Sequence, residues 1–289
     1  MLTQIVGDNK KSAVTLRKIK NLITHILLSG VALIWVYPFL WMVTASLKTG
    51  NEFFRDRLSL FPKSPTFENI VRVWSMENFS TYFLNTFIIT FFVVLIVLAI
   101  TALSGYVFGR YNFIGRKVVL VIFLSSISIP IVSTVIPMYE IVRSMGLIGT
   151  KMGVILATSG GAHVIFVLLF MSYFKQIPNE LEESAKIDGC GFFRTFISIM
   201  FPLAKPIATT VLIMESVWTW NDFLRPLVLT LNNPTARTLA VGLYAFKGEN
   251  TVDWTGIAAG GTIAIIPIVI LYMILQKYFV DGVAGAVKG

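Results

Sequence analysis

Long apolar stretches separated by short polar segments constrain this chain more than any other feature of its sequence. The chain has 289 residues, of which 55% are hydrophobic and 13% charged, and its mean hydropathy is +0.77. This is too apolar for a water-soluble domain. A helix needs about 20 apolar residues to cross the hydrocarbon core. Six stretches qualify, at about residues 22–47, 82–108, 118–141, 152–174, 206–223 and 257–279. The sequence therefore predicts an all-α integral membrane protein with six transmembrane helices.

We interpret residues 1–289 as a single membrane domain, because no internal repeat and no separate soluble segment is visible. The first span follows a basic N-terminal tail and is too long for the apolar region of a signal peptide, so we expect it to be uncleaved. Pro130, Pro137 and Pro267 lie inside predicted spans. Membrane helices tolerate proline where neighbouring groups satisfy the freed carbonyl. We therefore expect these prolines to mark kinks rather than helix ends.

The distribution of Lys and Arg predicts the orientation of the chain. The N-terminal tail and the short 110–117 loop carry the strongest concentration of positive charge, and short basic loops stay on the cytoplasmic side. Both termini are therefore expected in the cytoplasm. The net charge of +9 at pH 7 does not indicate a nucleic-acid partner, because the basic residues lie beside apolar stretches rather than in a separate module. Membrane lipid is the expected surrounding.

One polar segment, residues 179–202, has the pattern of two short helices joined by a turn. Asn179 is a candidate N-cap, and Gly189 and Gly191 permit a sharp reversal between the helices. Helices of about ten residues cannot span a bilayer, so they are expected at the cytoplasmic surface. Small residues such as Ser184 and Ala185 allow another protein to approach closely. The sequence therefore predicts a docking element here.

The residues of this segment resemble the EAA loop of ABC importer permeases. Glu183-Ser184-Ala185 is followed after three residues by Gly189, after nine more by Ile199, and then by Phe201-Pro202. The family pattern has Ala where this chain has Ser184 and Leu where it has Phe201. The resemblance implies a type I ABC importer permease fold in a prokaryotic inner membrane, with a core region at about 78–279. It also implies coupling to an ATPase through Glu183, Ser184, Ala185, Asp188, Gly189, Ile199 and Pro202.

Three further segments are similar to carbohydrate permeases of the maltose type, specifically to their second membrane subunit. They are Trp218–Leu227, Gln276–Gly289 and Pro65–Asn69. The resemblance implies a sugar or oligosaccharide importer in which this chain forms half of the translocation path. Its implied partners are a second homologous permease, a dimer of ABC ATPase subunits and an extracytoplasmic sugar-binding protein.

The same resemblance assigns roles to two other segments. The C-terminal residues Val283, Ala284, Gly285, Ala286, Val287, Lys288 and Gly289 would contact the ATPases. A loop containing Lys247, Gly248, Glu249 and Asn250 would enter the binding protein as a scoop. The sequence contains no G-x-x-x-x-G-K-[ST] phosphate-binding loop. We therefore expect a non-catalytic subunit without a cofactor of its own, with ATP and Mg²⁺ bound by the separate ATPase.

Glu215 is a carboxyl group inside the predicted fifth span, with Trp218, Trp220 and Asn221 close behind it. An acid at membrane depth is costly and usually faces a cavity or a partner. These four residues are candidates for the substrate path, where the rings would stack on sugars. Alternatively, Glu215 makes a hydrogen bond between helices and the Trp residues anchor at the membrane interface. Both interpretations stay open at the level of sequence.

Two other function classes would require features that differ from those of this sequence. An ion-gradient-driven secondary transporter would call for inverted repeats and several buried acids, whereas the spans contain one such acid. An intramembrane enzyme would need a nucleophile with its base, or a set of metal ligands. His25 and His163 stand apart from other ligand residues in the sequence, so no metal site is expected.

Overall fold

The computed structural model describes the backbone of all residues except 1, 57, 162, 249–251 and 288–289, and the side chains from residue 17 to 277 with the same internal gaps. The described residues form helices and turns, and their β pairing is an isolated bridge between Lys247 and Val252. The chain divides into two compact units. The first comprises Met1–Val73 with Asp253–Thr262, and the second comprises Trp74–Val252 with Ile263–Gly289.

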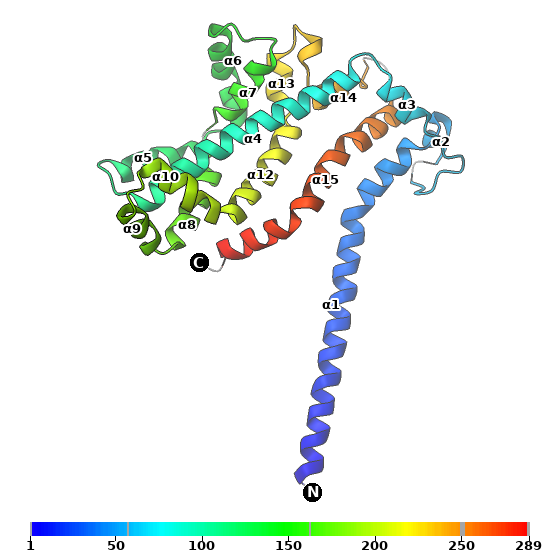
Figure 1. Ribbon diagram of the computed structural model, residues 1–289. Coiled ribbons are helices and arrows are strands. Elements are labelled where there is room, and N and C mark those ends of the chain that lie inside the picture. Colours follow the sequence, from blue (N-terminus) through cyan, green and yellow to red (C-terminus); the bar gives the residue numbers. More distant parts are fainter. Residues whose placement is uncertain (1, 57, 162, 249–251, 288–289) are drawn as a thin grey trace. The chain divides into compact units, whose positions relative to one another are not determined.

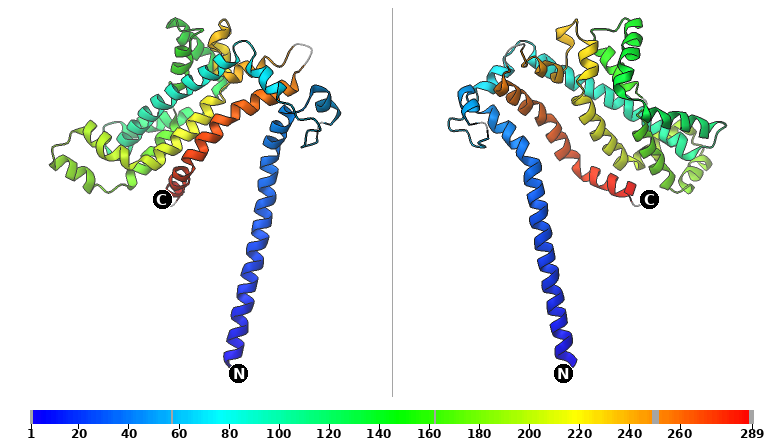
Figure 2. Two further views of the ribbon diagram at one scale, coloured as in Figure 1. Left: turned by 45° about the vertical axis from the view of Figure 1, so that its right-hand side comes forward. Right: turned by 180° about the vertical axis from the view of Figure 1, so that it is seen from behind.

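The first unit is built on α1 (Leu2–Ser46), a continuous helix that begins well before the predicted span (Figure 2). It also contains α2 (Gly50–Arg55), most of α3 (Glu68–Trp74) and the beginning of α15 (Trp254–Val287). A small apolar core joins these elements, formed by Ala45, Phe53 and Ala258 with Trp41 and Met42 packed against them.

Buried polar groups hold the loop that follows α1. The side chain of Lys48 is fully buried, and its Nζ donates hydrogen bonds to the carbonyl oxygens of Asp56 (2.9 Å) and Ser59 (2.6 Å). Asn69 Nδ2 donates to the carbonyl oxygens of Ser46 and Lys48. A buried ammonium group is tolerated only when it is hydrogen-bonded in this way. These hydrogen bonds therefore hold Asp56, Ser59 and Asn69 against the end of α1.

The second unit is organised around α4 (Phe79–Arg110), against which α7 (Lys151–Ser159), α8 (Val164–Gln176) and α12 (Lys205–Trp220) pack (Figure 1). Gly105 and Gly109 allow α4 and α8 to approach closely. A Cβ at Gly105 would overlap Phe170 of α8, and one at Gly109 would lie 3.1 Å from the carbonyl oxygen of Met171. The two backbones are thus in direct contact, as small residues permit in membrane helices.

Two of the predicted spans, 118–141 and 152–174, are broken, and a third break precedes the predicted span 206–223. α5 (Arg116–Ser125) and the short 3₁₀ turn after it are bent by 104° from the pair η2 (Ile131–Thr134) and α6 (Val135–Ser144). The bend between α7 and α8 is 53°. The bend before α12 is 80°, after α10 (Phe192–Thr195), the π-helical turn η3 (Phe196–Met200) and α11 (Phe201–Leu203).

The prolines behave in different ways. Pro130 lies in extended backbone at the break, so it ends the helix, contrary to the expectation of a kink. Pro137 occupies the first turn of α6, where its missing N–H removes no hydrogen bond. Pro267 lies within α15. Counting only described residues, three helices can cross a membrane by length and composition, Arg17–Ser46, Phe79–Arg110 and Trp254–Lys277, and six spans result if each bent pair is one.

The remaining short helices lie at the ends of the second unit. α9 (Glu180–Ile187) and α10 occupy the end where α4 finishes, whereas α6 and α13 (Leu224–Leu229) occupy the other end (Figure 1). A 3₁₀ turn (Pro234–Ala236) and α14 (Leu239–Tyr244) complete the unit. Its core joins α4, α7, α8 and α12 through buried residues such as Val97, Val154, Phe170 and Val211.

Candidate functional site

The polar segment 179–202 folds as predicted into short helices around a turn. α9 carries Glu180, Glu182 and Glu183 in its first turn, where the positive helix end favours acidic side chains. Asn179 occupies the N-cap position, but its backbone is helical and its side chain makes no capping hydrogen bond. The proposed Asn179 cap is therefore wrong, and the acidic first turn takes its place.

The turn after α9 depends on Gly189. Its φ is +76°, a left-handed conformation that side chains rarely adopt. The N–H of Cys190 donates to the carbonyl oxygen of Ala185 (2.8 Å), and the N–H of Gly189 donates to that of Lys186 (3.0 Å). This is the Schellman pattern of helix termination. A Cβ at Gly189 would meet open space within this chain, so the glycine leaves an accessible surface.

Arg110, the last residue of α4, anchors this segment. Its Nε lies 3.1 Å from Glu182 Oε1, and both side chains are almost fully buried. Its Nη1 also donates to the carbonyl oxygen of Ile177 (2.8 Å), and its Nη2 to that of Pro178 (3.3 Å). One guanidinium therefore joins the end of α4, the end of α8 and the start of α9. Breaking such a buried pair costs about 3–5 kcal/mol.

An aromatic cluster holds the second half of the segment. Tyr106 of α4 is fully buried, and its ring lies within 5.5 Å of the rings of Tyr111, Phe174, Phe192 and Phe196. Aromatic pairs at these distances add to the free energy gained from burial. The segment is consequently fixed to α4 and α8 through both its helices.

The predicted coupling residues divide between surface and interior. Glu183, Ser184, Asp188, Gly189 and Pro202 are exposed and Ile199 is partly buried, whereas Ala185 is 2% exposed. Ala185 therefore packs against this chain's own core rather than facing outward. Beside the exposed polar residues, Ile187 (86% exposed), Phe193 and Ile197 present apolar side chains. We call these exposed polar and apolar residues of the 179–202 segment the coupling surface.

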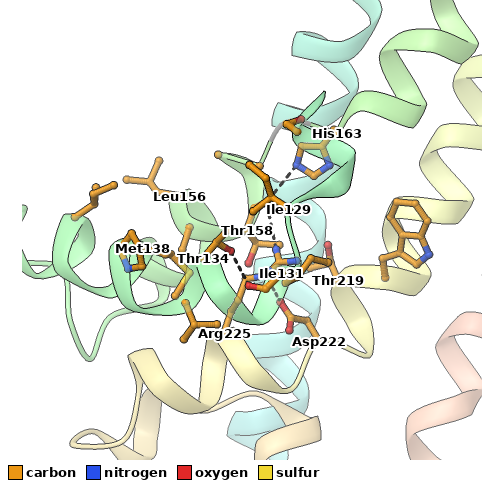
Figure 3. Close-up of a pocket in the computed structure, with 18 of the residues that line it drawn as sticks. Ile129, Ile131, Thr134, Met138, Leu156, Thr158, His163, Thr219, Asp222 and Arg225 are labelled. Carbon is orange, nitrogen blue, oxygen red and sulfur yellow. Dashed lines mark hydrogen bonds and ion pairs between the residues drawn. The ribbon is translucent and has the colours of Figure 1, made fainter. Parts of the chain in front are cut away.

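A cavity of about 680 Å³ lies at the other end of the second unit (Figure 3). Its walls come from the break between α5 and α6, from α7 and α8, and from α12 and α13. Most of the lining is apolar, including Ile127, Ile129, Ile131, Met138, Ile141 and Leu156. Polar side chains gather on one side of it, where Thr158, Thr219, Asp222 and Arg225 approach one another (Figure 3).

Glu215 of α12 is 2% exposed and lies on this polar side. Its Oε1 accepts a hydrogen bond from Thr219 Oγ1 (2.9 Å), and its Oε2 lies 3.6 Å from His163 Nδ1. The other ring nitrogen of His163 lies 3.2 Å from the carbonyl oxygen of Thr158. His163 starts α8 in a left-handed conformation, with φ +42°. Glu215 thus lines the cavity, and its hydrogen bond to Thr219 stays within α12. Its role in a substrate path stays a prediction.

A second charged pair stands beside the first. Arg225 Nε lies 3.3 Å from Asp222 Oδ2. Two polar atoms around the cavity, Glu215 Oε2 and Thr158 Oγ1, have no hydrogen-bond partner in the part of the chain that the structure describes, whereas Asp222 Oδ2 has Arg225 as its ion-pair partner. Buried oxygens in this state favour a ligand that donates hydrogen bonds.

The other predicted path residues are placed differently. Trp218 lines the cavity and stacks on Phe166 at 4.9 Å. Trp220 is buried, and its Nε1 donates to the carbonyl oxygen of Ala264 in α15. Asn221 is exposed and donates to the carbonyl oxygen of Val217. Neither Trp220 nor Asn221 is among the cavity's lining residues.

The two remaining predicted segments are only partly described. Lys247 forms the isolated bridge with Val252 and places its Nζ 5.9 Å from the ring centre of Tyr244, and Gly248 follows it. Glu249 and Asn250 lie outside the described residues. In the C-terminal tail, the backbone of 283–287 continues α15, and Lys288 and Gly289 also lie outside them.

Sequence reasoning missed several residues of both sites. Thr219 and Asp222 follow Glu215 at i+4 and i+7, a spacing that places all three on one face of a helix. This spacing could therefore have identified Thr219 and Asp222 from the sequence as neighbours of Glu215. Arg110 was read only as an orienting charge and His163 as an isolated histidine, because their partners lie far away in the sequence.

These features describe a protein of long apolar helices with a short-helix segment at one end of its second unit and a cavity, and the comparisons with known proteins identify its family. The chain belongs to the family of binding-protein-dependent transport system inner membrane components, whose model matches residues 101–285. The predicted class of permease and the all-α membrane fold are thereby confirmed, as is a multi-pass membrane protein.

Individual relatives extend the match over most of the chain. It is similar to the probable ABC transporter permease protein YurM of Bacillus subtilis (36% identity, covering 88% of this chain and 84% of YurM). It is also similar to the melibiose/raffinose/stachyose import permease protein MelC of the same organism (33% identity, 87% and 91%). Among solved structures, a chain of a bacterial ABC transporter that imports the acidic polysaccharide alginate matches with a TM-score of 0.79 and 25% identity, covering 91% and 97%.

Proposed function

We propose that this chain is a permease subunit of an ATP-driven, binding-protein-dependent importer of sugars or oligosaccharides. It would lie in a prokaryotic inner membrane with both termini in the cytoplasm. The names of several relatives support the substrate class, since they include import permeases for melibiose, galactooligosaccharides and arabinooligosaccharides. The observation that carries the proposal is an exposed coupling surface on a segment that Arg110 fixes rigidly to the transmembrane helices.

The proposed mechanism begins at the coupling surface. A separate ATPase dimer, which binds ATP and Mg²⁺, would grip α9 and the turn at Gly189, with Glu183 and Asp188 as its polar contacts. Movement of the ATPases would displace α9. Arg110 and the aromatic cluster around Tyr106 would pass this displacement to α4 and α8. This chain itself would hydrolyse no ATP.

The cavity is the proposed contribution of this chain to the translocation path. Trp218 offers a ring face for stacking, and Glu215 offers a hydrogen-bond acceptor. Trp220 and Asn221 would support the path by fixing the end of α12. A second permease would close the path from the other side. An external binding protein would deliver the sugar near the 247–250 loop, and the 283–289 tail would contact the ATPases.

The coupling role is tested by altering the exposed surface without altering the fold. Glu183→Ala should lower sugar uptake and ATPase retention, whereas Glu180→Ala, another exposed acid on the same helix, should change neither. Gly189→Asn adds bulk at small backbone cost, because Asn tolerates the left-handed conformation. Gly191→Asn is its control, since Gly191 has negative φ and open space around it.

The measurements are co-purification of the ATPase, and uptake of labelled saccharides in cells that express all subunits. If Glu183→Ala and Gly189→Asn both transport normally with the ATPase bound, the docking role is wrong. Uptake that collapses with a proton uncoupler while cellular ATP stays high would instead support the alternative of an ion-gradient-driven transporter.

A further inference from the structure

The segment of residues 234–248 is held by a helix that is distant from it in sequence. It runs from the 3₁₀ turn at 234–236 through α14 to the residue after Lys247, which forms the bridge with Val252. In the sequence this segment lies between α12 and α15. In the structure, α4 packs against both the 3₁₀ turn and α14 (Figure 1). The segment therefore takes its position from α4.

Asn85 of α4 pairs with the backbone of this segment. Its side chain is 1% exposed, and its Nδ2 donates to the carbonyl oxygens of Thr235 (2.8 Å) and Arg237 (2.9 Å). A carbonyl oxygen can only accept, so the amide nitrogen must face both partners and both of its hydrogens are used. A buried amide at membrane depth is costly unless it is paired in this way. Asn85 thus fixes the segment at two points.

Thr86 and Tyr82 hold the segment one turn further along. Thr86 Oγ1 accepts a hydrogen bond from the N–H of Leu239 (2.7 Å), the first residue of α14. A helix start leaves such N–H groups unpaired, so α4 supplies the missing acceptor. A Cβ at Gly242 would overlap the ring of Tyr82, which shows that the backbone of α14 lies directly on that ring. Positions 82, 85 and 86 have the spacing of one helix face.

The same helix carries the anchor of the coupling surface. α4 is continuous from Phe79 to Arg110, and Arg110 fixes α9 through Glu182 and the carbonyl oxygen of Ile177. One helix is therefore bonded to the 179–202 segment near its last residue and to the 234–248 segment near its first turns. In the proposed function these two segments meet different proteins, the ATPases and the sugar-binding protein.

We infer that Asn85 and Thr86 are positioning residues, which hold the 234–248 segment in the orientation that receives the external sugar-binding protein. The inference rests on the proposed function for the identity of that partner, but the hold of α4 on the segment does not. A segment that is free must be ordered when the partner binds, and this ordering lowers affinity. A segment that α4 already holds avoids most of that cost.

The hold of α4 is tested first, without any partner. Ala245 is exposed just after α14, so a spin label on Ala245→Cys in a Cys190→Ser background reports the motion of the segment in the full-length protein in lipid nanodiscs. Thr86→Val removes the acceptor for Leu239 with little change of shape, and should make the label more mobile. Thr101→Val is the matched control, since Thr101 is equally buried in α4 and donates to Val97 of the same helix. Equal label mobility in the two variants would overturn the inference.

The positioning role is tested in the complete importer, by titrating its ATPase activity with its purified sugar-binding protein. In Thr86→Val and Asn85→Leu, the concentration for half-maximal stimulation should rise about tenfold, the scale of ordering one or two side chains. ATPase activity without the binding protein should stay at the wild-type value. Asn69→Leu is the control for Asn85→Leu, because Asn69 Nδ2 also donates to two carbonyl oxygens, those of Ser46 and Lys48 in the first unit. It should leave the half-maximal concentration unchanged.

The outcomes separate a positioning role from a purely structural one. A structural role would lower the Tm of Asn85→Leu and of Asn69→Leu alike and leave both half-maximal concentrations at the wild-type value, and this result would refute the inference. If no sugar-binding protein stimulates the wild-type importer, the proposed function fails and the positioning role fails with it. The label at position 245 would then still show whether α4 holds the segment.

Discussion

At the scale of single residues, ion pairs differ according to their surroundings. In the first unit, Arg72 Nη2 lies 3.2 Å from Asp253 Oδ1, and the N–H of Gly256 donates to the same oxygen. Partial burial raises the pKa of Asp253, but the hydrogen bonds from Arg72 and Gly256 and the charge of Arg72 outweigh it and hold the pKa below its ordinary value. The hydrogen bond to Asp253 correspondingly raises the pKa of Arg72.

This pair predicts a specific dependence of stability on pH. A carboxyl group whose pKa is lower in the folded state stabilises the fold fully above its unfolded pKa, about 3.9 for Asp, and loses that contribution as pH falls through the folded value. The Tm of the wild type should therefore exceed that of Asp253→Asn at neutral pH, and the two should converge only under strongly acidic conditions. The measurement is thermal unfolding in detergent across this range.

Asp56→Asn is the control for that experiment. Asp56 lies 3.4 Å from Lys63 in an exposed pair, and exposed pairs contribute about 0–1 kcal/mol. Its Tm should stay close to that of the wild type throughout. A gap between wild type and Asp253→Asn that is independent of pH would contradict the role assigned to the Arg72–Asp253 pair.

The sequence revealed single residues only where their chemistry is unusual for the location. Glu215 was recognisable because a carboxyl group inside a span is rare and costly. Trp220 was grouped with Trp218 by proximity, but residues at i and i+2 do not share a helix face. Trp220 accordingly points to Ala264 rather than into the cavity. The partnership of His163 with Glu215 required the folded arrangement of two helices.

At the scale of elements, α9 behaves as an extension of α4 and α8 because of Arg110. Arg110→Lys keeps the charge but cannot reproduce the fork of hydrogen bonds to Glu182, Ile177 and Pro178. We expect the ATP hydrolysed per sugar transported to rise several-fold, since α9 would move without moving α4. The measurement is ATPase activity and uptake in the same proteoliposomes.

Two further variants sharpen this prediction. Glu182→Gln keeps an acceptor oxygen for Arg110, so its effect should be smaller than that of Arg110→Lys. Lys117→Met removes an exposed charge nearby and should leave the ATP hydrolysed per sugar transported unchanged. A result in which Arg110→Lys lowers the amount of assembled protein yet leaves the ATP hydrolysed per sugar at the wild-type value would show that Arg110 contributes to folding alone. That result would contradict this prediction.

The long helices could be predicted from the length of the apolar stretches, but the breaks within them could not. Pro130 ends a helix while Pro267 lies within one, because the outcome depends on whether the surrounding backbone can satisfy the freed groups. The short helices of residues 179–202 were predictable from acidic residues, glycine and proline. The burial of Ala185 was not predictable, because it depends on which face of α9 meets the core.

At the scale of the whole molecule, Cys190 offers a direct test of orientation. It is the single cysteine of the chain and lies partly exposed in the turn after α9. A membrane-impermeant maleimide should label it only after the cells are permeabilised. In a Cys190→Ser background, Leu58→Cys, at a position that is 82% exposed, should react from outside in intact cells. Labelling of Cys190 from outside would reverse the proposed topology.

An exposed coupling surface and a one-sided cavity indicate that other proteins complete them. The proposed ATPase partner follows from a motif, Glu183-Ser184-Ala185 with Gly189, rather than from any energetic feature of the residues.

The glycine contact between α4 and α8 sets a limit on how this protein can adapt. At most helix–helix contacts the interface consists of side chains, which can change rotamer when one helix shifts. At Gly105 and Gly109 the backbone of α4 lies directly against the backbone of α8, so no rotamer change can accommodate a shift there. If a displacement of α9 reaches α4 and α8 as proposed, these two helices would therefore move together at this contact rather than slide past each other.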